Sequence, residues 1–287
     1  MGKIRDRMLE ELNLRGLSAA TKETYLMCCR QFVAHYMRSP EQLGAAETKA
    51  FIVHLAQERK SSASSVCVYV AAIRFLYRVV LRRPEAVEDL PRPKIPRHLP
   101  CVPTRDEVRR ILEHIRSPKY RTILTFAYGA GLRLAEICQL KKDHFDAKEG
   151  LLHVRGGKGN KDRLVPLSPG MLRALEHYRV VVRPPGRLLF PGRTPEVPVH
   201  ETGVQRALKV VLRELGINKP LTPHSFRHGF ATHLLEDGED VRVIQAVLGH
   251  AHVQTTAHYA RVTTTRLRKV KSPVDRIFQR AKEARAR

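Results

Sequence analysis

The segment from residue 222 to residue 262 concentrates side chains that can bind a phosphate or attack one. His224 and Arg227 lie three positions apart, just after a Thr-Pro pair that suits the start of a helix, so both would share one helix face. The N-terminus of a helix also attracts phosphate groups. His250 follows a glycine that is typical of a helix end, and Tyr259 comes nine residues later. This set suggests a site for phosphate chemistry.

Two upstream segments carry further basic residues of the same kind. Arg133 stands in GAGLRLAEICQL, just past two glycines, where a helix can begin and present its guanidinium. Lys158 lies in a Gly-Gly-Lys-Gly turn, which lets the backbone approach a ligand closely, and Lys161 lies three residues further on. Neither segment has the GxxxxGK(S/T) pattern of a P-loop, so nucleotide hydrolysis has no support.

Each of these residues alone also has an ordinary structural interpretation. Tyr259 suits a half-buried core aromatic, Arg133 an exposed surface position and Lys158 a solvated loop. His224 and His228 are spaced to bind zinc, but a third ligand is missing from the pattern. A metalloprotease helix would also need a glutamate beside the first histidine, where this chain has serine.

The elements around these residues are predicted to be mainly helical with one β-hairpin. Thr104 and Glu107 form a capping-box pattern ahead of an apolar helical stripe. Residues 151–167 follow the pattern of strand, Gly-rich turn and strand. A Ser-Pro pair at 168–169 opens the next helix. We expect the other helices at 119–129, 133–142, 201–215, 223–236, 240–248 and 253–261.

Residues 1–83 predict a separate, all-helical domain of about 85 residues, because apolar side chains recur there at helical spacing. Six prolines fall between residues 84 and 103. Proline lacks an amide donor and restricts the residue before it, so we expect an extended linker there, with no helix or central strand.

The charge of the chain points to a polyanionic partner. Its 287 residues include 52 Lys and Arg against 28 Asp and Glu, a net charge of +24, which makes nucleic acid the first expected partner and an acidic membrane surface the second. An apolar content of 43% excludes wholesale disorder. No apolar run reaches the roughly 20 residues that cross a bilayer. Five cysteines, an odd number without a CxxC pattern, do not support a disulfide framework or a Cys-based zinc finger and fit a reducing compartment, so we expect a cytoplasmic protein.

The ordered set of six resembles the catalytic residues of the tyrosine recombinase, or phage integrase, family: Arg133, Lys158, His224, Arg227, His250 and Tyr259. The segments GLRLAEICQL, GGKGNKDRLVPL, HSFRHGFATHLL and LGHAHVQTTAHYARV look most like the Xer and integron-integrase branches. Residues 1–83 look like the helical core-binding domain of the family, so the resemblance covers nearly the whole chain. Lys161 competes with Lys158 as the catalytic lysine, and Lys158 is the better match to the first Gly-Lys-Gly position of the family.

The resemblance implies that Tyr259 attacks a DNA phosphodiester and forms a 3′-phosphotyrosyl bond. The two arginines would hold the non-bridging oxygens through paired hydrogen bonds. His224 and His250 would donate further hydrogen bonds or help to move the tyrosine proton, and Lys158 would protonate the leaving 5′ oxygen. No metal, ATP or other cofactor is expected, because the covalent link conserves the bond energy for religation.

The implied fold is mainly α with a small β-hairpin, arranged as a two-domain DNA clamp. We expect a helical core-binding (SAM-like) domain, a Pro-rich linker, a catalytic domain and a basic C-terminal tail, at residues 1–83, 84–103, 104–271 and 272–287.

The expected function is site-specific recombination of double-stranded DNA by a homo-tetramer on two DNA sites. The protein would be associated with the nucleoid when bound to DNA and would not involve a membrane. The tail would either dock on a neighbouring subunit through Ile277 and Phe278 or touch DNA nonspecifically. A type IB topoisomerase-like activity and a catalytically silent DNA-binding regulator are the alternatives.

Overall fold

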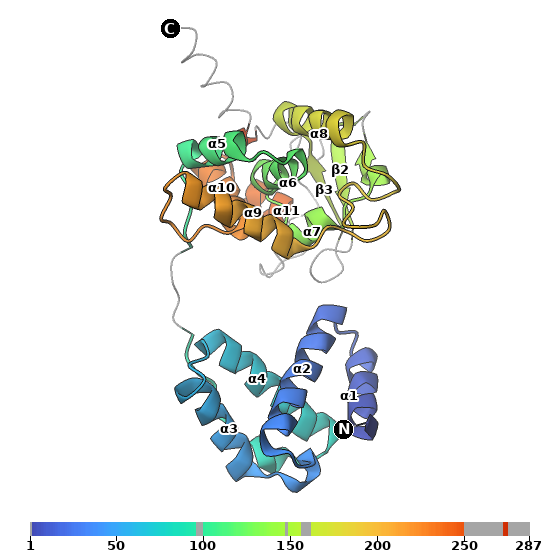
Figure 1. Ribbon diagram of the computed structural model, residues 1–287, viewed down its shortest axis with the longest axis vertical. Coiled ribbons are helices and arrows are strands. Elements are labelled where there is room, and N and C mark those ends of the chain that lie inside the picture. Colours follow the sequence, from blue (N-terminus) through green and yellow to red (C-terminus); the bar gives the residue numbers. More distant parts are fainter. Residues whose placement is uncertain (1, 96–99, 147–148, 156–161, 250–271, 275–287) are drawn as a thin grey trace. The chain divides into compact units, whose positions relative to one another are not determined.

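The computed structural model describes residues 2–95, 100–146, 149–155, 162–249 and 272–274. The chain divides into two compact units, Met1–His98 and Leu99–Arg287 (Figure 1). Each unit has a hydrophobic core of its own. The fold is mainly helical with one small sheet, as the sequence predicts.

The N-terminal unit is built from helices only, within the part of it that the structure describes. Ser18 caps the second helix by accepting a hydrogen bond from the Thr21 amide at 3.2 Å, and Ser62 caps the fourth in the same way. The unit contains α1 (Gly2–Leu14), α2 (Ala19–Tyr36), η1 (Pro40–Gln42), α3 (Ala45–Gln57), α4 (Ala63–Phe75), a π-helical turn η2 (Leu76–Val80) and η3 (Pro84–Val87).

Aromatic side chains fill the centre of this unit. The rings of Phe32 and Phe51 meet edge to face with centroids 5.2 Å apart, and Tyr77 is fully buried beside them. The continuous helix Ala63–Val80 is long and apolar enough to cross a membrane by length and composition alone, with a mean hydropathy of 1.5. Its inner face lies in the core of the unit, as in the central helix of a globular domain.

The expectation of an extended segment from residue 84 onward is wrong at its start. Pro84 opens a 3-10 helix, and Ala86, Val87 and Leu90 are buried in the N-terminal core. The Thr48 hydroxyl also donates to the Ala86 carbonyl at 2.6 Å. Pro84 does not prevent this helix, because a proline at the first helical position needs no amide donor. Burial of the three apolar side chains then stabilises the segment against the N-terminal core.

The second unit combines helices with a three-stranded antiparallel sheet in the order β1-β2-β3. The predicted hairpin is confirmed, with Leu152 opposite Val165, and a short third strand that the sequence analysis did not predict adds to its edge. The described elements are α5 (Arg105–His114), α6 (Pro118–Gly129), α7 (Leu134–Cys138), η4 (Lys142–His144), β1 (Phe145–Asp146), β2 (Leu151–Val154), β3 (Arg163–Pro166), α8 (Pro169–Val182), α9 (Glu201–Glu214), α10 (Pro223–Glu236) and α11 (Val241–Leu248).

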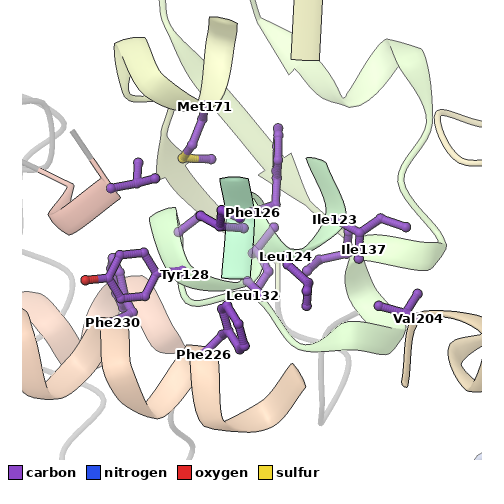
Figure 2. Close-up of a cluster of buried hydrophobic side chains, with 14 of the residues drawn as sticks. Ile123, Leu124, Phe126, Tyr128, Leu132, Ile137, Met171, Val204, Phe226 and Phe230 are labelled. Carbon is purple, nitrogen blue, oxygen red and sulfur yellow. The ribbon is translucent and has the colours of Figure 1, made fainter. Parts of the chain in front are cut away.

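Helix α6 is the centre of this unit and packs against both α8 and α10 (Figure 1). Its side chains are buried nearly all round, which is typical of a core helix. Figure 2 shows Phe126 and Tyr128 of α6 among residues from several other elements, including Met171 of α8 and Phe226 and Phe230 of α10. This core fixes α10, the helix that carries His224 and Arg227.

Two predicted boundaries in this unit need correction. The helix expected at 133–142 ends at Cys138, because the following residues join the sheet region: Lys141 bridges Leu188 and Phe145 pairs with Leu152. The tail expected to begin at residue 272 starts inside the core. Val274 is fully buried, and the Ser272 hydroxyl donates to the Gly129 carbonyl at 2.7 Å.

Candidate active site

Helix α10 presents His224 and Arg227 from its first turns. Thr222 caps the helix and Pro223 occupies its first position, as the sequence predicts. His224 is exposed, whereas Arg227, three residues along, is buried, with only 3% of its surface exposed. The Arg227 guanidinium donates one hydrogen bond to the Gly131 carbonyl and another to the Leu248 carbonyl, the latter at 2.7 Å. Arg227 therefore links the turn before α7 to the end of α11.

The turn before α7 depends on glycine at position 131. Gly131 has a φ of +60°, a conformation that L side chains rarely adopt, and a Cβ there would lie 2.5 Å from Phe230 Cδ1 and 2.6 Å from Leu248 Cδ2. The absence of a side chain lets the turn approach α10 and α11 closely. Arg133 follows as the N-cap residue of α7, where the sequence analysis expected a helix to begin.

A buried carboxylate, that of Glu136, holds Arg133. It accepts hydrogen bonds from the Arg133 amide at 2.9 Å and from Arg133 Nη1 at 2.8 Å. It also accepts a bidentate pair from Arg163 of β3, at 3.0 Å from Nη1 and 2.6 Å from Nη2. Burial alone would raise the pKa of Glu136, but the bonds and charges of Arg163 and Arg133 outweigh it and lower the pKa to about 2. Glu136 is therefore ionised at neutral pH.

The field around these residues is positive. Burial and the nearby charge of Arg133 lower the pKa of Arg227 to about 10, so it stays protonated at neutral pH. Partial burial, His228, Arg227 and Arg133 all lower the pKa of His224. The His224 and His228 rings meet edge to face with centroids 4.7 Å apart. A phosphate entering this field would be stabilised by the two arginines, and it would favour protonation of His224.

The structure thus brings three of the six predicted site residues together. Arg133, His224 and Arg227 lie close enough for each charge to influence the others. Lys158, its competitor Lys161, His250 and Tyr259 lie outside the described residues. The described stretch 162–249 begins just before β3 and ends just after α11, and both elements contact the three residues or their partners.

Two residues of this cluster, Glu136 and Arg163, were not predicted from the sequence. Glu136 stands three positions after Arg133, and an acid at the third position of a helix is a capping-box signal that could have found it. Arg163 carried no comparable signal. Its partner Glu136 lies 27 positions away, and only the folded chain brings the two together.

The zinc interpretation of His224 and His228 finds no support in the described part of the chain. No group of three or more His, Cys, Asp and Glu side chains is placed there to hold a metal ion. The positive charges of Arg227 and Arg133 lower the pKa of His224, and that of Arg227 lowers the pKa of His228; these charges also disfavour a cation at that position.

Comparisons with known proteins agree along the length of the chain. The model of the phage integrase family matches residues 102–266, and that of the phage integrase N-terminal SAM-like domain matches residues 4–86. The tyrosine recombinase XerA of Thermococcus kodakarensis is 38% identical over 90% of this chain and 90% of its own. An integrase/recombinase of Escherichia coli is 33% identical over 95% of this chain and 93% of its own.

The fold has the same relatives. A lambda integrase, crystallised as a tetramer bound to a Holliday junction, superposes with a TM-score of 0.68 at 19% identity and covers 89% of this chain and 79% of that one. The family models reach into both units and the relatives span nearly the full chain, so this protein belongs to the phage integrase family and is a site-specific tyrosine recombinase.

Proposed function

We propose that this recombinase cuts and rejoins DNA through a 3′-phosphotyrosyl bond to Tyr259. The observation that carries the proposal is the meeting of Arg133, Arg227 and His224 in one positive cluster on the catalytic unit. In-line attack on a phosphodiester concentrates negative charge on the non-bridging oxygens. Two guanidiniums can hold those oxygens in fixed geometry, which a pair of lysines cannot reproduce.

The remaining roles follow from the chemistry of the step. A tyrosine with an ordinary pKa near 10 is a weak nucleophile unless nearby cations favour the phenolate, and the arginine cluster supplies such cations. Lys158, or Lys161 in its place, would give a proton to the leaving 5′ oxygen. His224 and His250 would bind the phosphate or take the phenol proton. The bond between Tyr259 and DNA keeps the energy of the broken one, so religation needs neither ATP nor a divalent metal.

We also propose how the two units share the DNA. Residues up to Leu90 would act as the core-binding domain, the Pro-rich segment after Leu90 as the linker, residues 104–274 as the catalytic domain and residues 275–287 as the tail. The net charge of +24 and the match of the N-terminal unit to the SAM-like domain of phage integrases support this division. Binding would weaken steeply with salt, because each phosphate contact releases counterions.

The assembly would be four protomers on two DNA sites. The tetramer of lambda integrase on a Holliday junction supports this proposal by analogy of fold. A reducing, cytoplasmic location with nucleoid association fits the free cysteines and the DNA substrate. Membership of the recombinase family disfavours topoisomerase-like relaxation and a catalytically silent regulator.

Trapping the covalent intermediate tests the proposal. Footprinting on DNA that adjoins the gene would define a site, and a nicked duplex of that site would release the short 5′-hydroxyl strand and prevent religation. We expect the wild type to form a denaturant-resistant protein–DNA adduct in the presence of EDTA. Tyr259→Phe removes the nucleophilic oxygen and should abolish the adduct.

A second tyrosine provides the matched control. Tyr178 is buried in α8, distant in sequence from Tyr259, and its hydroxyl donates to the Leu189 carbonyl at 3.0 Å. Tyr178→Phe should keep the adduct. An adduct that persists in Tyr259→Phe would identify another nucleophile, and a wild type that forms none on its footprinted site would overturn the proposed chemistry.

A further inference from the structure

Arg163, at the first position of β3, contacts two separate parts of the candidate active site. Its Nη1 and Nη2 donate to the two oxygens of Glu136, and its Nε donates to the Val247 carbonyl in the last turn of α11 at 2.9 Å. Its aliphatic part lies against Gly249, where a Cβ would approach Arg163 Cδ to 3.0 Å. One side chain therefore ties the hairpin, α7 and α11 together.

The contacts of Arg163 separate its role from that of Arg133. All three guanidinium nitrogens of Arg163 have protein acceptors, and only 9% of its side chain is exposed. Arg133 donates Nη1 to the same carboxylate but keeps 24% of its side chain exposed. Arg133 is thus placed to meet a phosphate, whereas Arg163 is occupied within the protein.

The charge balance of the cluster indicates what Arg163 does: it shares the Glu136 carboxylate with Arg133. The Glu136 side chain is 8% exposed, and a buried carboxylate needs hydrogen-bonded cationic partners. Without Arg163, Glu136 would depend on Arg133 alone and would compete with a phosphate for its guanidinium. Sharing the carboxylate between two arginines leaves the cluster of Arg133, Arg163, Arg227 and Glu136 with a net positive charge.

Arg163 also completes the end of α11. The last carbonyls of a helix lack intrahelical partners and carry partial negative charge. Arg163 binds the carbonyl of Val247, and Arg227 binds that of Leu248. Two adjacent carbonyls are thus each bound by an arginine, which fixes α11 against the same cluster that holds Arg133.

We propose that Arg163 is a positioning residue for recombination: it holds Glu136 and the end of α11 together and thereby sets the placement of Arg133 and Arg227 at the phosphate. This inference rests on the proposed role of the two arginines. A displacement on the order of 1 Å in such a site costs about a hundredfold in rate, so small shifts are enough to matter.

Arg163→Lys tests this proposal, because lysine keeps the charge but cannot make the bidentate pair and the backbone bond together. On the nicked duplex at saturating protein, we expect single-turnover cleavage to slow by about tenfold or more, with DNA affinity within a few-fold of wild type. Arg105→Lys is the matched control. Arg105 also binds a carboxylate, that of Asp237, and a backbone carbonyl, that of His233 at 3.0 Å, but it does so at the far end of α10.

We expect both lysine variants to lose similar thermal stability and only Arg163→Lys to lose cleavage. Equal cleavage by the two variants would overturn the proposal. A double-mutant cycle with Glu136→Gln then tests the route of action, since the two changes should be clearly non-additive if Arg163 acts through Glu136. Additive effects on cleavage would also overturn it. Wild-type cleavage in parallel keeps this outcome distinct from a failure of the proposed function, which would leave no adduct at all.

Discussion

Arg227 combines two tasks at the scale of a single residue. Its guanidinium links the carbonyls of Gly131 and Leu248, which belong to segments 117 positions apart in the chain, and it lies within the field of Arg133. Charged hydrogen bonds of this kind contribute about 1.5–3 kcal/mol each. These two bonds use two of the five N–H donors of the guanidinium, so the same planar group can hold the backbone and still offer other donors to a phosphate.

We therefore predict a large catalytic loss for Arg227→Lys. A single ammonium cannot bridge two carbonyls and offer a planar pair of donors to phosphate oxygens. Single-turnover cleavage of the nicked duplex should fall by about a hundredfold or more, as for loss of one charge-stabilising donor, while DNA binding changes only a few-fold. Arg110→Lys, at an exposed arginine that donates to the Leu215 carbonyl, should cleave like wild type. Near-normal cleavage by Arg227→Lys would remove Arg227 from the site.

The spacing of residues in the sequence predicts some members of the site and does not predict others. His224 and Arg227 are three apart on one helix, so local geometry alone places them together. Arg133 follows a glycine turn that also has a local signal. Arg163 meets Glu136 only because β3 packs beside α7, and no periodicity in the chain encodes that contact. Tertiary pairing of this kind becomes visible only in the folded structure.

At the scale of elements, predictions based on capping residues succeeded where the cap and the helix are local neighbours. Thr104, Ser168 and Thr222 all cap the helices they were expected to open, and Gly249 ends α11 with a left-handed φ of +62°. Predictions failed where a distant partner decided the outcome. The end of α7 and the turn at Pro84 both follow from burial or strand pairing with segments far along the chain.

The structure shifts the start of the C-terminal tail, and this shift changes how the tail should be tested. Val274 is packed in the catalytic core, where its Cγ1 lies near Gly129, while Ser272 binds the Gly129 carbonyl. A test of subunit docking must therefore keep residues 272–274. A deletion that begins at residue 272 would remove a buried valine and confuse loss of docking with loss of stability.

We predict that a chain ending after Val274 keeps its melting temperature and loses cooperative occupation of paired DNA sites. Residues 275–287 contain Ile277 and Phe278, the apolar side chains proposed to dock on a neighbouring subunit. A chain ending after Lys271 should melt lower, because burial of one valine contributes about 1.5–3 kcal/mol. Gel-shift titration on two-site DNA measures the cooperativity. Unchanged cooperativity in the chain that ends after Val274 would contradict docking and favour nonspecific contact of the tail with DNA.

At the scale of the whole molecule, the repulsion between like charges differs between the free protein and the DNA-bound protein. A net charge of +24 repels itself in the free chain and is neutralised on a polyanion. Histidines that folding partly removes from solvent add to this repulsion when protonated. Burial is the first cause that lowers the pKa of His144, His224, His228 and His233. His233, whose Nδ1 lies 2.8 Å from the Tyr128 hydroxyl, also faces Arg105, which lowers its pKa further, and Glu236 and Asp237, which act in the opposite direction.

We predict that the free energy of unfolding of the free protein decreases as the pH falls below about 6.5, the ordinary pKa of histidine. The folded state holds these histidines neutral to a lower pH than the unfolded chain does, so the unfolded chain takes up more protons and gains stability on acidification. Glu136 adds a second loss between its unfolded value of 4.5 and its folded value of about 2. Urea unfolding at pH 7.5 and pH 5.5 measures the first window. His233→Gln, which removes one buried titrating group, should reduce the difference between the two pH values, and a wild type equally stable at both would show that these histidines do not control the acid stability of the fold.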